Sequence, residues 1–100
     1  VTDEVICVDN TMFQFIKGKN VTVLFVPTDA DLSNLPEKYR NPDCLLIDTV
    51  PENLDLISCN TVIFSGSEKQ FKKNYDSIKE ISPTVISTSE RNITVNLNGG

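Results

Sequence analysis

The sequence lacks histidine and tryptophan, and it contains only three cysteines and four glycines in 100 residues. Histidine is the one side chain whose ordinary pKa lies in the neutral range, and its imidazole is the commonest metal ligand in proteins. Its absence removes both the usual proton shuttle and the usual nitrogen ligand of zinc. The composition therefore argues against a hydrolytic enzyme more clearly than it favours any one activity.

Long apolar runs are absent, and basic residues are few. No segment approaches the roughly 20 apolar residues of a membrane helix, and the N-terminus lacks the basic and apolar regions of a signal peptide. Nine basic residues against 14 acidic ones give a formal net charge of −5, which opposes a large phosphate-binding face. We therefore expect neither membrane insertion nor direct nucleic-acid binding.

The three cysteines form no metal or redox motif. Cys7, Cys44 and Cys59 are far apart, include no Cys-x-x-Cys pair and are odd in number. Because each lies in or beside an apolar segment, we predict buried free thiols. A single disulfide between two of them is the alternative, since sequence spacing does not give distances in the fold.

The length suffices for one compact domain with one core, because 39% of the residues are hydrophobic. We predict a single soluble domain over residues 1–100. The chain starts at Val1, almost directly in a strand-like segment. On this basis we expect a domain excised from a longer protein.

Short apolar runs between turn residues predict seven strands. The first two runs are separated by Asp9-Asn10, which favours a hairpin, and the third is apolar on nearly both faces, which favours an internal strand. The predicted strands comprise residues 5–8, 12–16, 20–26, 44–47, 61–64, 84–87 and 93–97.

Three connections have helical spacing. Apolar residues recur at intervals of three and four over residues 32–39, where a proline must lie in the first turn, and a proline also opens a short helical turn over residues 51–57. Ser67 and Gln70 have the spacing of a capping box, and apolar residues follow at i, i+4 and i+7 over residues 71–78. The third helix is thus the most regular.

The resulting order is β-β-β-(α)-β-α-β-α-β-β. Strands joined by short helical segments can lie parallel in one sheet, with the helices mainly on one face, while hairpins supply antiparallel edges. We predict an α/β fold with a mixed β-sheet. The predicted core comprises Ile6, Val8, Val23, Phe25, Leu46, Val62, Phe64, Phe71, Ile78, Val85 and Val95.

A family resemblance covers nearly the whole chain as a pattern of strands. It is carried by residues 21–30 (VTVLFVPTDA), 41–48 (NPDCLLID) and 61–66 (TVIFSG), with residues 85–88 (VIST) and 91–95 (RNITV) at the end. These segments resemble the C-terminal half of a metallo-β-lactamase-like domain. They are similar in particular to the version at the C-terminus of ComEC-type competence membrane proteins, which take up DNA.

The departures from that family lie at its metal site. Active members carry a Gly-Asp or Thr-Asp pair, and Thr28-Asp29 stands there, but the later His-His-Gly-Ser and Gly-His-Pro segments are replaced by DTVP at residues 48–51 and GSE at residues 66–68. Without imidazoles, a zinc pair and its bound hydroxide are not expected. The resemblance therefore implies no catalysis, metal or cofactor, and leaves as vestigial site positions Asp29, Asp48 and Gly66.

The role implied by the resemblance is structural or partner-docking, within DNA uptake. The domain would be a soluble, extracytoplasmic part of a bacterial cell-membrane protein, in contact with the rest of its parent chain or with other uptake proteins. If a preceding half normally covers one face, the isolated domain would expose an apolar patch and self-associate. In a further alternative, this chain is one half of an intact hydrolase, and a preceding half supplies every histidine.

Two acidic segments offer other interpretations. Residues 42–51 resemble the phosphoacceptor strand of bacterial receiver domains, with Asp48 as acceptor and Asp29 or Asp31 as its magnesium-binding partner. The acidic pair is closer in sequence than that family requires, and no lysine follows residues 84–87 in the expected place. Residues 29–33 copy the start of a calcium loop but lack its later glycine and glutamate, so we favour a solvated loop.

The start of the third helix is a candidate contact site. Its free backbone N–H groups could hold an anion, although capping by Ser67 explains the same residues. Lysines on the polar face of this helix could meet an acidic partner or be solvated. The candidate anion or partner contacts are Ser65, Ser67, Lys69, Lys72 and Lys73.

Overall fold

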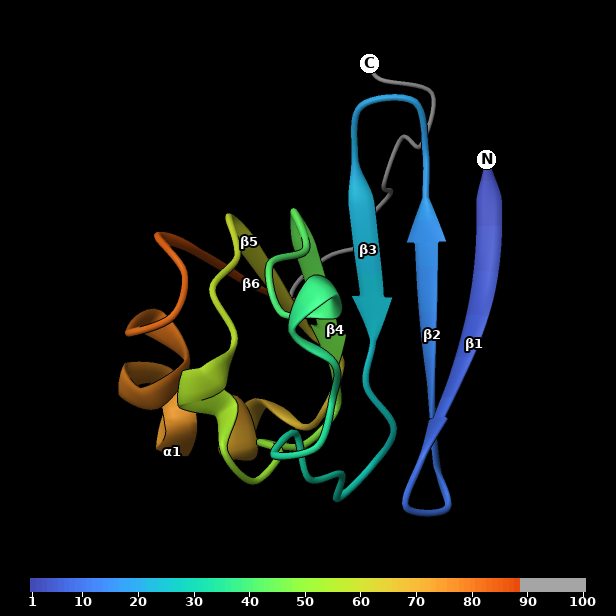
Figure 1. Cartoon of the computed structure of the whole chain (residues 1–100). Helices are drawn as coiled ribbons and strands as arrows, with labels where there is room; N and C mark the ends of the chain where they lie inside the picture. The colour runs from blue at the N-terminus through green and yellow to red at the C-terminus, as the bar shows by residue number, and fades with distance from the viewer. Residues whose placement is uncertain (89–100) are drawn as a thin grey trace.

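The computed structural model describes residues 1–88 and contains a six-stranded mixed sheet, one α-helix and two 3-10 turns (Figure 1). The prediction of an α/β fold with a mixed sheet is confirmed. The predicted strand at residues 93–97 lies outside the described residues. The elements are β1 (Thr2–Val8), β2 (Thr11–Lys17), β3 (Thr22–Phe25), η1 (Glu37–Tyr39), β4 (Cys44–Ile47), η2 (Leu54–Leu56), β5 (Thr61–Phe64), α1 (Glu68–Lys79) and β6 (Thr84–Ser87).

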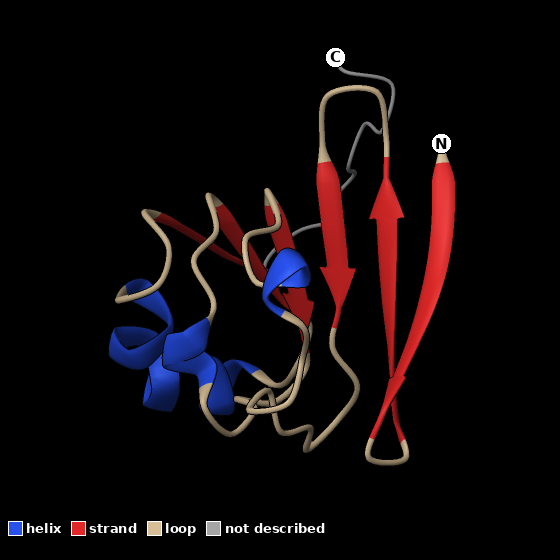
Figure 2. Ribbon diagram, viewed as in Figure 1, coloured by secondary structure: helices blue, strands red, loops and turns tan. Residues whose placement is uncertain are grey.

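The six strands lie side by side in their sequence order. β1, β2 and β3 form an antiparallel meander, and β3 to β6 are parallel, so β3 is internal as predicted. Crossovers between parallel strands are right-handed, and successive crossovers in one direction place their connections on one face. The helix and the two turns accordingly lie together on one side of the sheet (Figure 2).

The hairpin between β1 and β2 follows from its turn residues. Asp9 and Asn10 have φ values of 49° and 65°, the positive φ at both central positions of a type I′ turn. Asp and Asn tolerate this conformation better than most residues. The turn sets the pairing of Val8 with Thr11 and hence the register along both strands.

The helix predicted over residues 32–39 is instead the single 3-10 turn η1. Pro36 precedes it in an extended conformation, with ψ of 142°. The Leu32 N–H donates to the Glu52 carbonyl at 3.0 Å, next to an isolated bridge between Asp31 and Glu52. The extended backbone at Pro36 interrupts a helix across residues 32–39, and the Leu32 N–H, which a first helical turn would leave without an intrahelical acceptor, is bonded to a neighbouring connection.

Of the other two predicted helical segments, one forms a short 3-10 turn and the other forms an α-helix. The turn after Pro51 is the 3-10 turn η2, preceded by Asn53 with a φ of 63°. The third helix forms as predicted: α1 begins after Ser67, whose Oγ accepts the Gln70 N–H at 3.2 Å. Side-chain capping of this kind satisfies one of the orphan amides at a helix N-terminus.

The core lies between the helical side of the sheet and its connections. Leu24, Leu45 and Val62 are neighbours in register on β3, β4 and β5, and all three are fully buried. Ile78 of α1 and Phe64 at the end of β5 belong to the same cluster. Of the predicted core residues, Ile6, Val23, Val62, Phe64 and Ile78 are buried, and Val8, Phe71 and Val85 are half-buried against the cluster.

The face of the sheet that points away from the helical connections, called the second face, is also apolar. Val23 and Ile63 are buried outside the main cluster, and Phe25 and Leu46, which are register partners, are half-buried. The prediction of Phe25 and Leu46 as core is wrong, because they lie one residue out of phase with Leu24 and Leu45. The predicted core residue Val95 lies outside the described residues.

The three cysteines are free thiols in different environments. Cys59 is buried and Cys44 is half-buried, whereas Cys7 is exposed. The prediction of a buried Cys7 is wrong, because this residue lies on the second face of the outermost strand β1. Burial raises the pKa of the Cys59 thiol from 9.0 to about 11.

We expect the three thiols to react in the order of their exposure. At pH 8, a maleimide should label Cys7 first and Cys59 last, because burial both shields the Cys59 thiol and disfavours its thiolate. Since the folded pKa is raised, the stability from protonated Cys59 is present below pH 9 and lost towards pH 11. Timed labelling followed by peptide mass spectrometry measures the order, and early labelling of Cys59 would contradict it.

Candidate functional site

The candidate site lies where β3, β4 and β5 end. These strands are parallel neighbours, so the segments that follow them meet at one edge of the sheet. The structure therefore brings together Asp29, Asp48 and Gly66, the three predicted vestigial positions. Open parallel sheets bind their ligands at this end of the strands, which makes it the first place to look for chemistry.

Two hydrogen bonds tie the loop after β3 to the end of β4. The Thr28 hydroxyl donates to Asp48 Oδ2 at 2.5 Å. The Asp29 N–H donates to Thr49 Oγ1 at 3.0 Å, with Asp29 held at a φ of 56°. Asp48 and Asp29 thus each have a threonine as partner, so the arrangement holds two loops together.

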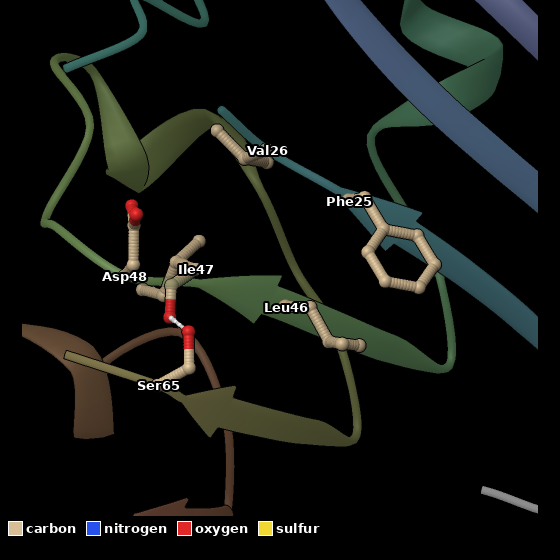
Figure 3. Close-up of a pocket in the computed structure, with 6 residues that line it drawn as sticks. All are labelled: Phe25, Val26, Leu46, Ile47, Asp48 and Ser65. Carbon is tan, nitrogen blue, oxygen red and sulfur yellow. Dashed lines mark hydrogen bonds between the residues drawn. The ribbon is translucent and has the colours of Figure 1, made fainter. Parts of the chain in front are cut away.

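A cavity of about 230 Å³ opens beside Asp48 (Figure 3). Asp48 Oδ1 is buried and has no hydrogen-bond partner among the described residues. Unpartnered buried oxygens are rare in proteins, so this atom marks the most unusual polar position of the site. The cavity is lined by Phe25, Val26, Leu46, Ile47, Asp48 and Ser65.

Gly66 allows β4 and β5 to approach each other at their ends. A Cβ atom at this position would lie 2.3 Å from the Asp48 backbone oxygen and 2.7 Å from Cε1 of the Phe64 ring. Both distances are far below van der Waals contact. The glycine is therefore explained by packing, independently of any ligand.

Of the five predicted contact residues around the third helix, Ser65 lines the cavity and the other four do not. Ser65 bonds to β4, since its N–H and its hydroxyl both donate to the Ile47 carbonyl, at 2.8 and 3.3 Å. Ser67 caps α1. Lys72 pairs with Glu68 at 3.2 Å on the exposed helix surface, a contact of small energetic value. Lys69 and Lys73 are exposed on the same helix.

The residues at this edge do not fit the zinc centre of the resembled family. No three histidine, cysteine, aspartate or glutamate side chains gather closely enough to hold a metal in residues 1–88. The two carboxylates, Asp29 and Asp48, would have to serve without imidazole ligands. Zinc sites use at least three protein ligands, most often histidine or cysteine.

The sequence pattern missed the threonines of this edge. Thr28 and Thr49 were not among the predicted site residues, because their roles depend on which strand lies beside which. A similar pair closes the opposite end of the sheet, where Thr22 N–H donates to Asp43 Oδ2 at 2.8 Å and Asp43 N–H donates to Thr22 Oγ1 at 3.0 Å. The signal that could have found these contacts is a threonine and an aspartate at corresponding ends of neighbouring strands.

No family model, curated protein or solved structure matches this chain. No helix among residues 1–88 is long and apolar enough to cross a membrane.

Proposed function

We propose that this chain is a non-catalytic, metallo-β-lactamase-like half domain of a ComEC-type competence protein, and that it acts by docking. The observation that carries the proposal is the one-sided sheet. Helical connections pack on one face, while the other is apolar and has no described helix on it. Domains are built from packed layers, so an apolar sheet face fits against a second layer.

The chemistry of the second face favours a protein partner. Among the described strand residues on this face, Asp3 is the one charged side chain, and it is bonded to Gln14. A face with so little charge does not suit a nucleic-acid backbone. It suits the apolar face of another β-sheet, and we assign that sheet to the preceding part of the parent protein.

The edge of the sheet that carries Asp29, Asp48 and Gly66 supports a role without catalysis. The Asp48 carboxylate accepts from the Thr28 hydroxyl, the Asp29 backbone N–H donates to Thr49, and Gly66 is required by packing. The chain contains no histidine that could act as a general base at neutral pH. On this proposal, the Thr28–Asp48 contact stabilises the loops beside the docking face.

Photo-cross-linking in the full-length parent protein tests the proposed docking face. A photo-reactive amino acid in place of Phe25 reports from the second face, and one in place of exposed Lys73 on α1 is the matched control. We expect cross-links from position 25 to peptides of the preceding part of the same polypeptide, and none from position 73. Cross-links from position 73 alone would overturn the assignment of this face.

A receiver-like phosphoacceptor is the second candidate, favoured by the position of Asp48 at the end of β4 and its unpartnered Oδ1. The sheet order argues against it, because receivers have the doubly wound order 2-1-3-4-5 and this chain has its strands in sequence order.

Magnesium and beryllofluoride distinguish the two candidates. Under the docking proposal, their addition leaves the amide NMR signals around Asp48 unchanged. Shifts confined to that region, and lost in Asp48→Asn, would instead establish the phosphoacceptor.

A further inference from the structure

The outer edge of β1 is open among the described residues. β1 pairs with β2 over seven residues in an uninterrupted register, and no described strand pairs with its other side. Proteins usually protect an exposed edge with a proline, a charged side chain (most often lysine), a bulge or a short strand. β1 has the sequence TDEVICV, without proline, lysine or a bulge, and its two acids, Asp3 and Glu4, are bonded within the chain to Gln14 and Tyr39.

The register determines which backbone groups face outward. The Gly18 N–H donates to the Val21 carbonyl at 2.7 Å, so the even-numbered residues of β2 bond to β3 and the odd-numbered ones bond to β1. On β1 the partners of those odd-numbered residues are even-numbered. The amide groups of Asp3, Val5 and Cys7 therefore point away from the sheet.

Exposed apolar side chains lie beside this edge. Val5 is 58% exposed and Met12 is 64% exposed, the largest exposed fractions among the big hydrophobic residues after Val1. Cys7 is also exposed and is the register partner of Met12. All three share the second face of the sheet, so open backbone groups and an apolar patch occur together.

We propose that β1 pairs antiparallel with β1 of a second copy of this chain, around a two-fold axis at Val5. In this register Val5 lies opposite Val5 of the other copy, and Asp3 lies opposite Cys7. Each outward-facing residue then has a backbone partner, as antiparallel pairing requires. An isologous contact of this kind needs only that one surface complements itself.

The charges of β1 are compatible with this register. Glu4 lies opposite Ile6, so no carboxylate faces another across the axis. Both acids already have partners: Asp3 accepts from Gln14 at 3.0 and 2.9 Å, and Glu4 accepts from the Tyr39 hydroxyl at 2.8 Å. The apolar patches of the two copies meet on one face. Because the interface is one strand wide, we expect a weak, concentration-dependent dimer.

Sedimentation velocity over a wide concentration range, in reducing buffer, tests this dimer. We expect self-association of the unmodified chain and at least about tenfold weaker association of Val5→Pro, which removes an outward N–H without touching the β2 ladder. Val5→Thr keeps that N–H and is the matched control. Val5→Lys, an ordinary edge-protecting residue, supplies a second variant if Val5→Pro fails to fold.

Hydrogen exchange gives a residue-specific readout. Raising the concentration should protect the amides of Val5 and Cys7, while Ile6, already bonded to β2, should not change. A chain that stays monomeric at every concentration would overturn the proposal. So would a dimer that persists in Val5→Pro and Val5→Lys; if Leu46→Glu abolishes it, association runs through the second face instead.

Discussion

Replacing Phe64 by alanine is expected to lower the free energy of unfolding by about 3–5 kcal/mol. Phe64 is fully buried at the end of β5, and its ring centroid lies 5.8 Å from that of Phe71 on α1. The substitution would remove the Phe64–Phe71 contact between the sheet and α1 and leave a cavity beside Gly66. This is the largest single-residue effect that we expect in the chain.

Urea denaturation followed by circular dichroism measures this loss. Phe25→Ala is the matched control, because the same side chain is half-buried on the second face. It should cost clearly less than Phe64→Ala. If Phe64→Ala does not fold, Phe64→Leu should still fold with a smaller loss, since its volume change is smaller. Equal losses at positions 25 and 64 would contradict the assignment of the core to the helical face.

Replacing Gly66 by alanine is expected to destabilise the domain by about 3 kcal/mol, although it adds one methyl group. The added carbon would meet the Asp48 backbone oxygen at 2.3 Å and the Phe64 ring at 2.7 Å. Neither obstacle is the flexible end of a side chain: one is backbone and the other is a ring held in the core. The ends of β4 and β5 would have to move apart.

Thermal unfolding compares this variant with Ser67→Ala at the neighbouring position. Loss of the Ser67 cap should cost about 1 kcal/mol, and Gly66→Ala should lower Tm several times further. A Gly66→Ala variant as stable as the unmodified chain would show that the strand ends are not packed as described. Because position 66 lies next to Asp48, we also expect Gly66→Ala to disturb the Thr28–Asp48 hydrogen bond.

The strands of the second half were predictable because each combines an apolar run with clear boundaries. Residues 44–47, 61–64 and 84–87 are strands as expected, and the start of α1 follows from the Ser67 cap. The hairpin was predictable for a similar reason, since Asp9-Asn10 suits the positive φ values of its turn. In each case local chemistry agrees with the tertiary structure.

The inward-facing side chains were not predictable in β3 and β4. Both faces of these strands are apolar, so alternation could not tell Leu24 from Phe25 or Leu45 from Leu46. The inward face is decided by the helical connections between the parallel strands, which lie on one side of the sheet (Figure 2). Likewise, the spacing over residues 32–39 predicted a helix, but the backbone is extended at Pro36 and the chain forms only the 3-10 turn η1 after it.

The candidate site was predictable in position but not in its contacts. Asp29, Asp48 and Gly66 each follow a predicted parallel strand, so their meeting at one edge followed from the strand order. The Thr28–Asp48 and Thr49–Asp29 hydrogen bonds depend on register between β3 and β4. Register of this kind is set by packing across the sheet.

Metal titration distinguishes a domain that acts through its shape from one that acts through a metal centre. Zinc and cobalt are titrated calorimetrically into the purified chain, after removal of any histidine tag, and the same sample is incubated with DNA and RNA. We predict no stoichiometric uptake of either metal and no cleavage. Tight binding of one or two metal ions per chain together with nuclease activity would show instead that the domain is a metal-dependent nuclease.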